Sequence, residues 1–118
     1  MILVELNGGV GNQMFQYAAA KSLALHHKTT LKLDITPAAD KTMPDELTQR
    51  PFELYQFNIT DPLADLTDIN SFRIRSTLNK FSEKVKLNYK RKMYREPFFH
   101  FDNNFYKAGP DVYLKGLW

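Results

Sequence analysis

The stretch NGGVGNQMFQYAAAKSLA, residues 7–24, decides the fold. Three glycines within four positions separate a short apolar run from a long helix-forming run. Glycine gives the main chain access to positive φ and leaves room for a ligand to approach the backbone. The first N–H groups of a helix have no partners inside the helix and point toward the same spot. A turn of this kind therefore suits a phosphate, a carboxylate or a sugar oxygen.

The segments on both sides of this turn predict a strand–helix–strand unit. Residues 2–6 are short and apolar, as in a buried strand. A helix is expected from Asn12, its N-cap, to about His27. Residues 29–34 alternate in polarity and form a second strand. Because strands joined through a helix lie parallel, we predict the α/β class, with a Rossmann-like parallel sheet and flanking helices.

The predicted helix carries few polar residues before Lys21 and three consecutive alanines that permit close packing. This composition indicates a helix that neighbouring elements cover on most sides. The side chains expected to be buried are Met14, Phe15, Tyr17, Ala18, Ala19, Leu23 and Leu25.

Beyond residue 34 the pattern is weaker. A proline-punctuated loop is expected, followed by an extended or short helical segment at residues 51–59. Asp68 is a candidate cap for a helix that begins near Ile69, with broken basic helices continuing to about residue 92. We predict a short strand at residues 97–102 and a third main strand at residues 111–118.

Composition excludes several classes of site. The chain of 118 residues has no cysteine, so it has no disulfide, no cysteine-based zinc site and no thiol nucleophile. The N-terminus lacks the basic region of a signal peptide, and no apolar run approaches the ~20 residues of a membrane span. We therefore expect one domain or part of one, in the cytoplasm.

Charge is divided unevenly along the chain. Residues 34–68 carry eight acids and two bases, whereas residues 73–95 carry nine bases and one acid. The basic segment has two interpretations: an anion-binding face, or the solvated surface of helices. One alternative function is therefore a module that binds nucleic acid or an anionic membrane through this segment.

Two familiar phosphate loops differ from the glycine turn. The nucleoside-triphosphate loop requires Gly-Lys-Ser/Thr, but Asn12 and Gln13 follow Gly11. The dinucleotide fingerprint G-x-G-x-x-G is matched in part, with Met14 at the third glycine and Asp34 near the position of a ribose-binding acid. Dinucleotide binding is therefore a second alternative function. A third alternative is that the turn only joins strand to helix. Asp34 itself has two possible roles, as a cleft residue or as a loop cap.

At residues 8–24 the sequence resembles the bacterial α-1,2-fucosyltransferases of glycosyltransferase family 11. The family opens with a strand, then G-G-x-G-N-Q-M-F-Q-Y-A, then a helix, and every specified position matches here. Residues 55–59, 99–102 and 112–118 also look like later segments of the family, in the same order.

The resemblance implies transfer of L-fucose from GDP-fucose to the 2-hydroxyl of a galactoside, with inversion. It implies no metal, no other cofactor and no nucleic-acid partner. The family's fold is a two-domain, GT-B-like arrangement with the site between the domains. By analogy, the side of the cleft formed by this chain includes the turn residues Gly8, Gly9, Gly11, Asn12 and Gln13. The glycines would let the donor approach the backbone, Asn12 would bond a ligand oxygen, and Gln13 would assist or brace the loop.

The family's donor-binding motif His-x-Arg-Arg-Gly-Asp does not occur in the chain. Residues 1–118 are therefore expected to form the N-terminal Rossmann-like domain, without the C-terminal domain and inactive alone. No residue is assigned as the catalytic base. The expected location is the cytoplasm, with peripheral contact to the inner membrane as a further option.

Overall fold

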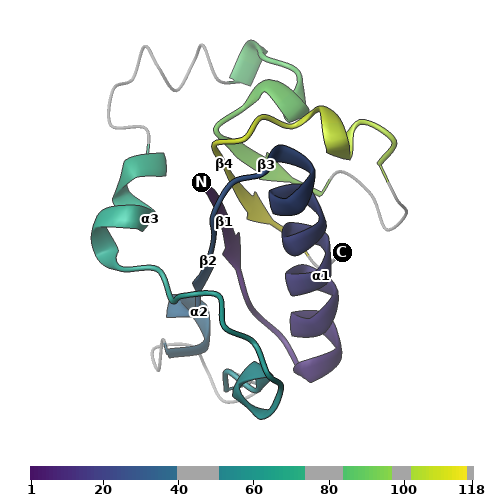
Figure 1. Cartoon of the computed structure of the whole chain (residues 1–118). Helices are drawn as coiled ribbons and strands as arrows, with labels where there is room; N and C mark the ends of the chain where they lie inside the picture. Colours follow the sequence, from purple (N-terminus) through teal and green to yellow (C-terminus); the bar gives the residue numbers. More distant parts are fainter. Residues whose placement is uncertain (40–50, 74–83, 97–101, 117–118) are drawn as a thin grey trace.

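The computed structural model describes residues 1–39, 51–73, 84–96 and 102–116. Four parallel strands form one sheet in the order β2-β1-β4-β3. The strands are β1 (Ile2–Glu5), β2 (Leu31–Asp34), β3 (Met93–Arg95) and β4 (Val112–Lys115). The helices are α1 (Val10–His27), α2 (Thr36–Ala39) and α3 (Leu66–Phe72), and single 3₁₀ turns lie at η1 (Leu54–Gln56), η2 (Asn88–Lys90) and η3 (Phe105–Lys107). The predicted α/β class with a parallel sheet and flanking helices is confirmed (Figure 1).

The two faces of the sheet have separate cores because side chains alternate along each strand. Ile2 and Val4 point to the α1 side, where the larger core also takes in Leu23. Leu3 points to the opposite side and packs with Tyr113 of β4 and Phe72 of α3. The sheet is therefore covered by α1 on one face and by α3 on the other (Figure 1).

Helix α1 begins about one turn earlier than predicted, at Val10. Its N-cap is Gly9 rather than Asn12, and no side chain caps the first turn. The Gln13 N–H already donates to the Gly9 carbonyl at 3.1 Å, which closes the first helical turn over Gly11 and Asn12. Asn12 is thus inside the helix, and its side chain is released from a capping role.

The way in which α1 ends places the start of the second strand later in the chain than predicted. Lys28 adopts the left-handed conformation, with φ of 52°, and its N–H donates to helix carbonyls. The Thr29 N–H donates back to the Ala24 carbonyl at 3.0 Å. These bonds terminate the helix in the usual left-handed way. Consequently β2 starts at Leu31, not at Thr29 as the β-branched pair suggested.

The prediction that α1 is covered on most sides is wrong. Its buried residues are Gln13, Gln16, Ala20, Leu23 and Ala24. The opposite side of the helix is exposed although much of it is apolar, with Met14, Phe15 and Leu25 exposed by 46%, 66% and 67%. Two glutamines therefore occupy core positions while a phenylalanine and a methionine lie in solvent.

The acidic segment packs beside β2 and leads into α3. Leu33 bonds the main chain on both sides of Leu63, at Pro62 and Ala64. The N-cap of α3 is Asp65, and Asp68 is the third helical residue of a capping box, so the predicted cap at Asp68 is displaced by one turn. Lys32 of β2 donates to both oxygens of Asp68, and this pairing holds the pKa of that carboxyl below its usual range.

Of the two C-terminal strands, β4 was predicted from the sequence and β3 was not. The third main strand is confirmed as β4, over Val112–Lys115. The edge strand β3, Met93–Arg95, was missed because it lies at the end of the basic segment and has little apolar pattern. Most of the strand predicted at residues 97–102 lies outside the described residues. In the parts of the chain that are described, no helix has both the length and the apolar character needed to cross a bilayer.

Candidate functional site

The glycine turn lies at the carboxyl end of β1, in the middle of the sheet. Strand β1 pairs with β2 on one side and with β4 on the other. Ligands of open α/β sheets bind outside the carboxyl ends of the strands. The turn therefore has the position that such a site requires, with α1 beginning at it (Figure 1).

The three glycines of the turn have different physical roles. Gly8 has φ of +72°, and a Cβ built on it would meet the Asn12 side-chain nitrogen at 2.6 Å. Gly8 is therefore required by the turn itself. Gly9 and Gly11 have no atom within 4 Å of a built Cβ, so they face open space. Of the three glycines in the turn, Gly9 and Gly11 therefore expose their backbone although the fold has room for a side chain there.

Within the described parts of the chain, the donors of the first turn of α1 have no side-chain partner, and they lie beside that open space. The first N–H groups of a helix have no internal acceptors, and here no side chain caps them and no acid lies in the first turn. Asn12 is exposed, and its side chain forms no hydrogen bond within the described parts of the chain. The turn therefore offers main-chain donors and one amide to an anionic or hydroxylated ligand.

Gln13 points inward and holds the turn in place. Its side chain is fully buried. Its amide nitrogen donates to the carbonyls of Gly8 and Pro51 at 2.9 and 2.8 Å, and its oxygen accepts from the Glu53 N–H at 2.9 Å. All the hydrogen-bonding groups of Gln13 contact main chain, as a brace of the turn would.

Gln16 is a second brace, which sequence reasoning did not single out. It is also fully buried, and it accepts from the Asn7 N–H at 2.9 Å. Its amide nitrogen donates to the Asn7 side-chain oxygen at 3.0 Å and to the Gly116 carbonyl at 2.9 Å. Gln16 therefore ties the chain leaving β1 to the chain leaving β4. The signal for Gln16 in the sequence was its spacing from Gln13. Gln16 follows Gln13 by one helical turn, so both side chains lie on the same side of α1, which is the buried side.

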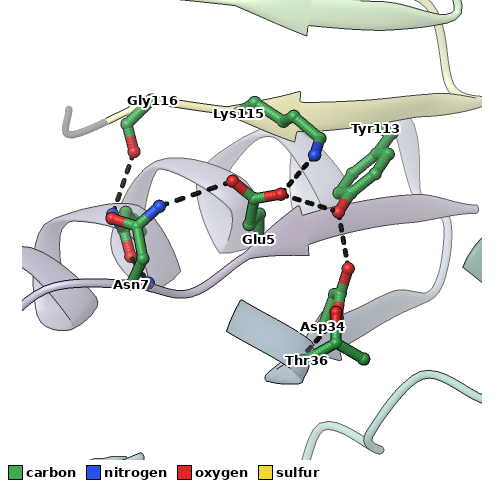
Figure 2. Close-up of polar contacts among 8 residues, drawn as sticks. Glu5, Asn7, Asp34, Thr36, Tyr113, Lys115 and Gly116 are labelled. Atoms are coloured by element: carbon green, nitrogen blue, oxygen red, sulfur yellow. Dashed lines mark hydrogen bonds and ion pairs between the residues drawn. The ribbon is translucent and has the colours of Figure 1, made fainter. Parts of the chain in front are cut away.

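A polar cluster at the ends of three strands supports the turn from the other face (Figure 2). Glu5 accepts from Lys115 and, at 3.4 Å, from the Asn7 side chain. The Tyr113 hydroxyl lies 2.5 Å from an Asp34 oxygen and 3.1 Å from the same Glu5 oxygen that binds Lys115. This cluster joins β1, β2 and β4 at their carboxyl ends, and no local pattern in the sequence predicts which of its residues pair.

The electrostatics of this cluster keep Tyr113 neutral. Burial of the hydroxyl, its hydrogen bond to Asp34 and the nearby charges of Glu5 and Asp34 all raise the pKa of Tyr113 far above its usual range. Asp34 is almost fully buried, and its second oxygen accepts from the Thr36 N–H and hydroxyl at 2.8 and 2.7 Å. Asp34 is therefore the loop cap of the two roles considered, and both its oxygens are already engaged.

A third polar group fixes the outer part of α1. Asp61 accepts from the Tyr17 hydroxyl at 2.7 Å and from the Lys21 ammonium at 2.8 Å. Burial, followed by this hydrogen bond and the charge of Asp61, raises the pKa of Tyr17 to about 12.

Phe15, expected in the core, is exposed beside the turn, so that expectation was wrong.

Comparison with known proteins gives one partial match. The chain is 53% identical over 55 residues to the O-antigen biosynthesis glycosyltransferase WbnK of Escherichia coli. The matched stretch covers 46% of this chain and 18% of that relative. No family model matches the sequence. No solved structure matches it either.

Proposed function

We propose that this chain is part of a glycosyltransferase and that its glycine turn borders the binding site for the sugar nucleotide and acceptor. The observation that carries the proposal is the 53% identity over 55 residues to a glycosyltransferase. The position of the turn at the carboxyl edge of a parallel sheet agrees with such a role. Its main-chain donors, which no side chain caps in the described parts of the chain, and its exposed Asn12 suit phosphate and sugar oxygens.

The finer proposal is α-1,2-fucosyl transfer from GDP-fucose to a galactose 2-hydroxyl. It rests on the resemblance of residues 8–24 to the family 11 fucosyltransferases. Inversion requires one direct displacement, in which a base takes the acceptor proton and donors stabilise the leaving diphosphate. In this proposal Asn12 and the bare backbone at Gly9 and Gly11 contact the ligand, while Gln13 and Gln16 keep the turn rigid.

The proposal treats residues 1–118 as an N-terminal domain that works with a donor-binding C-terminal domain. The family motif His-x-Arg-Arg-Gly-Asp is not in the chain, so its diphosphate-binding arginine is not among these residues. We therefore expect the chain alone to bind ligand fragments without turnover.

The test is a titration of the ¹⁵N-labelled chain, observed by amide NMR. We expect GDP-fucose or a galactoside to shift the amides of Gly9, Gly11 and Asn12, and the variant Asn12→Ala to weaken binding at least fivefold. Asn103→Ala, at an exposed asparagine just before η3 and near the opposite end of α1, is the matched control. Shifts confined to other regions would contradict the role of the turn. Equal responses to GDP-fucose, GDP-mannose and UDP-galactose would leave glycosyl transfer standing and contradict the fucosyl donor.

The Gly11→Ala variant separates binding from folding. Alanine is favoured over glycine within a helix by roughly 0.5–1 kcal/mol, and a Cβ at this position meets no neighbour. We expect a fold at least as stable as the parent, with weaker ligand binding. Unchanged binding would mean that no ligand approaches the backbone there.

Dinucleotide binding is disfavoured by the state of Asp34. A ribose-binding acid must offer its oxygens to the ligand, but Asp34 is buried and engaged with Thr36 and Tyr113. The same titration with NAD and FAD tests this alternative, and shifts at Gly9 and Gly11 with either compound would restore it.

A further inference from the structure

A basic surface lies where the chain enters β3 and β4. A pocket of about 290 Å³ is present there, and its lining carries four cations and one acid. The cations are Lys90, Arg91, Lys92 and Lys107. The acid, Asp111, is already paired with the N-terminal ammonium at 3.6 Å, so its charge is partly offset. The pocket therefore has an excess of positive charge.

The neighbouring residues 84–87 extend this surface with apolar side chains. The Arg91 guanidinium donates to the carbonyls of Lys84 and Lys86 at 2.8 and 3.0 Å, which holds the segment against the pocket. Val85 and Leu87 are exposed by 74% and 58%. We call residues 84–92 together with Lys107 the basic rim.

Two lysines of the basic rim are available to an external partner. Lys84 and Lys90 are exposed, and neither ammonium has a hydrogen bond or an ion pair within the described parts of the chain. By contrast, Lys21, Lys32 and Lys115 are each paired with a carboxylate. The chain thus satisfies its lysines near the sheet core and leaves cations open at the rim.

We propose that the basic rim docks on an anionic membrane surface, with lipid phosphates at the lysines and Val85 and Leu87 inserted between the headgroups. Alternating cations and exposed aliphatic side chains fit a surface that is anionic outside and apolar below. Single-stranded nucleic acid fits less well, because its bases stack on open aromatic rings. Duplex nucleic acid offers phosphates to the lysines but no apolar layer for Val85 and Leu87. The aromatic ring of the basic rim, Tyr89, is half-buried and has the Lys107 ammonium 5.9 Å from its centre.

The basic rim is separate from the glycine turn. The rim adjoins the starts of β3 and β4, whereas the turn follows the end of β1, and all these strands are parallel. Figure 1 shows residues 84–92 and the start of α1 at opposite ends of the molecule. A membrane held at the rim would therefore leave the turn open to a soluble ligand.

The experiment is vesicle co-sedimentation of the 118-residue chain. Vesicles of phosphatidylglycerol and phosphatidylcholine are compared with vesicles of phosphatidylcholine alone, at low and at high salt. We expect binding to the anionic vesicles only, weakened by salt. The double variant Lys84→Gln/Lys90→Gln should lose about 25-fold in affinity, at about fivefold for each cation near the surface. The matched control Lys28→Gln/Arg73→Gln removes the same charge from exposed sites elsewhere and should bind as the parent does.

A second variant, Val85→Ser/Leu87→Ser, tests insertion. It keeps every charge, so we expect weaker vesicle binding with the same salt dependence. If Lys84→Gln/Lys90→Gln and Lys28→Gln/Arg73→Gln lose the same affinity for the anionic vesicles, net charge alone explains the binding and the proposal is overturned. Inhibition by free glycerol phosphate at constant ionic strength, or duplex DNA binding that is tighter than vesicle binding and lost in the Lys84→Gln/Lys90→Gln variant, would also overturn it. Circular dichroism of each variant confirms that the fold is retained.

Discussion

The two ends of the parallel sheet treat polar groups in opposite ways. At the carboxyl end, buried amides and carboxylates are bonded to one another and to the main chain, through Gln13, Gln16 and Asp34. At the other end, Lys84 and Lys90 remain in solvent beside exposed aliphatic side chains. A buried polar group must be satisfied because leaving it unpaired costs free energy, whereas an exposed cation is satisfied by water.

This difference suggests a division of roles. The carboxyl end uses its polar residues to hold one backbone turn in a fixed shape, which leaves main-chain donors and Asn12 facing outward. The other end fixes its backbone through Arg91 and leaves the ammonium groups of Lys84 and Lys90 exposed, without a partner in the described parts of the chain. A rigid turn suits recognition of a small ligand, and exposed cations suit contact with an anionic surface.

The largest effect is expected from Gln16→Ala. The change leaves the Asn7 N–H and the Gly116 carbonyl without their partner in a partly buried site. Each buried group left unpaired costs roughly 1–3 kcal/mol, so the free energy of unfolding should fall by about 3 kcal/mol. Urea denaturation measures it. The exposed neighbour Asn12→Ala should change stability by less than about 0.5 kcal/mol, and equal effects in the two variants would contradict the contrast between inward and outward amides.

Gly8→Ala should have the next largest effect. Its φ of +72° is unfavourable for alanine, and the new methyl group would collide with the Asn12 amide. We expect a loss of about 2 kcal/mol in the free energy of unfolding. Gly9→Ala is the matched control, because Gly9 has an extended backbone and open space around it. Similar destabilisation by both changes would show that the turn does not depend on the left-handed residue.

A smaller effect is expected from pH. Tyr113 and Tyr17 have raised pKa values in the fold, and that of Tyr17 is about 12. An unfolded tyrosine ionises near pH 10, so the stability from these hydroxyls is fully present below about pH 10 and is lost as the pH rises through the folded values.

Urea midpoints measured from about pH 9 to about pH 11.5 should therefore fall, and Tyr113→Phe should reduce the slope of that fall. Tyr55→Phe removes a hydroxyl that is 72% exposed and should leave the slope as in the parent. If Tyr113→Phe keeps the full slope, the hydroxyl does not titrate with unfolding.

The smallest effect on stability is expected at the basic rim. Lys84→Gln/Lys90→Gln removes no hydrogen bond or ion pair within the described parts of the chain, so the free energy of unfolding should stay within about 0.5 kcal/mol of the parent. A larger loss in urea denaturation would mean that these lysines are structural, like those paired at the carboxyl end.

Much of the fold could be predicted because it depends on local rules. The apolar run of β1, the glycines after it and the alternation in β4 each carry a signal within a few residues. The edge strand β3 could not be recognised, because three residues, Met93–Arg95, have no period to read. The exposed side of α1 was mistaken for a core face because the sequence shows that residues are apolar and not what lies opposite them.

By itself the sequence determined the parallel strand–helix–strand unit and the bare turn at its centre, because glycine geometry and apolar periodicity act over short distances. Only the tertiary structure decided which side-chain amides near the turn form hydrogen bonds with the protein's own backbone and which face outward. Gln13 and Gln16 find partners 38 and 100 residues away, at Pro51 and Gly116 respectively. Such partners are brought together by the packing of the whole sheet, and no local pattern records them.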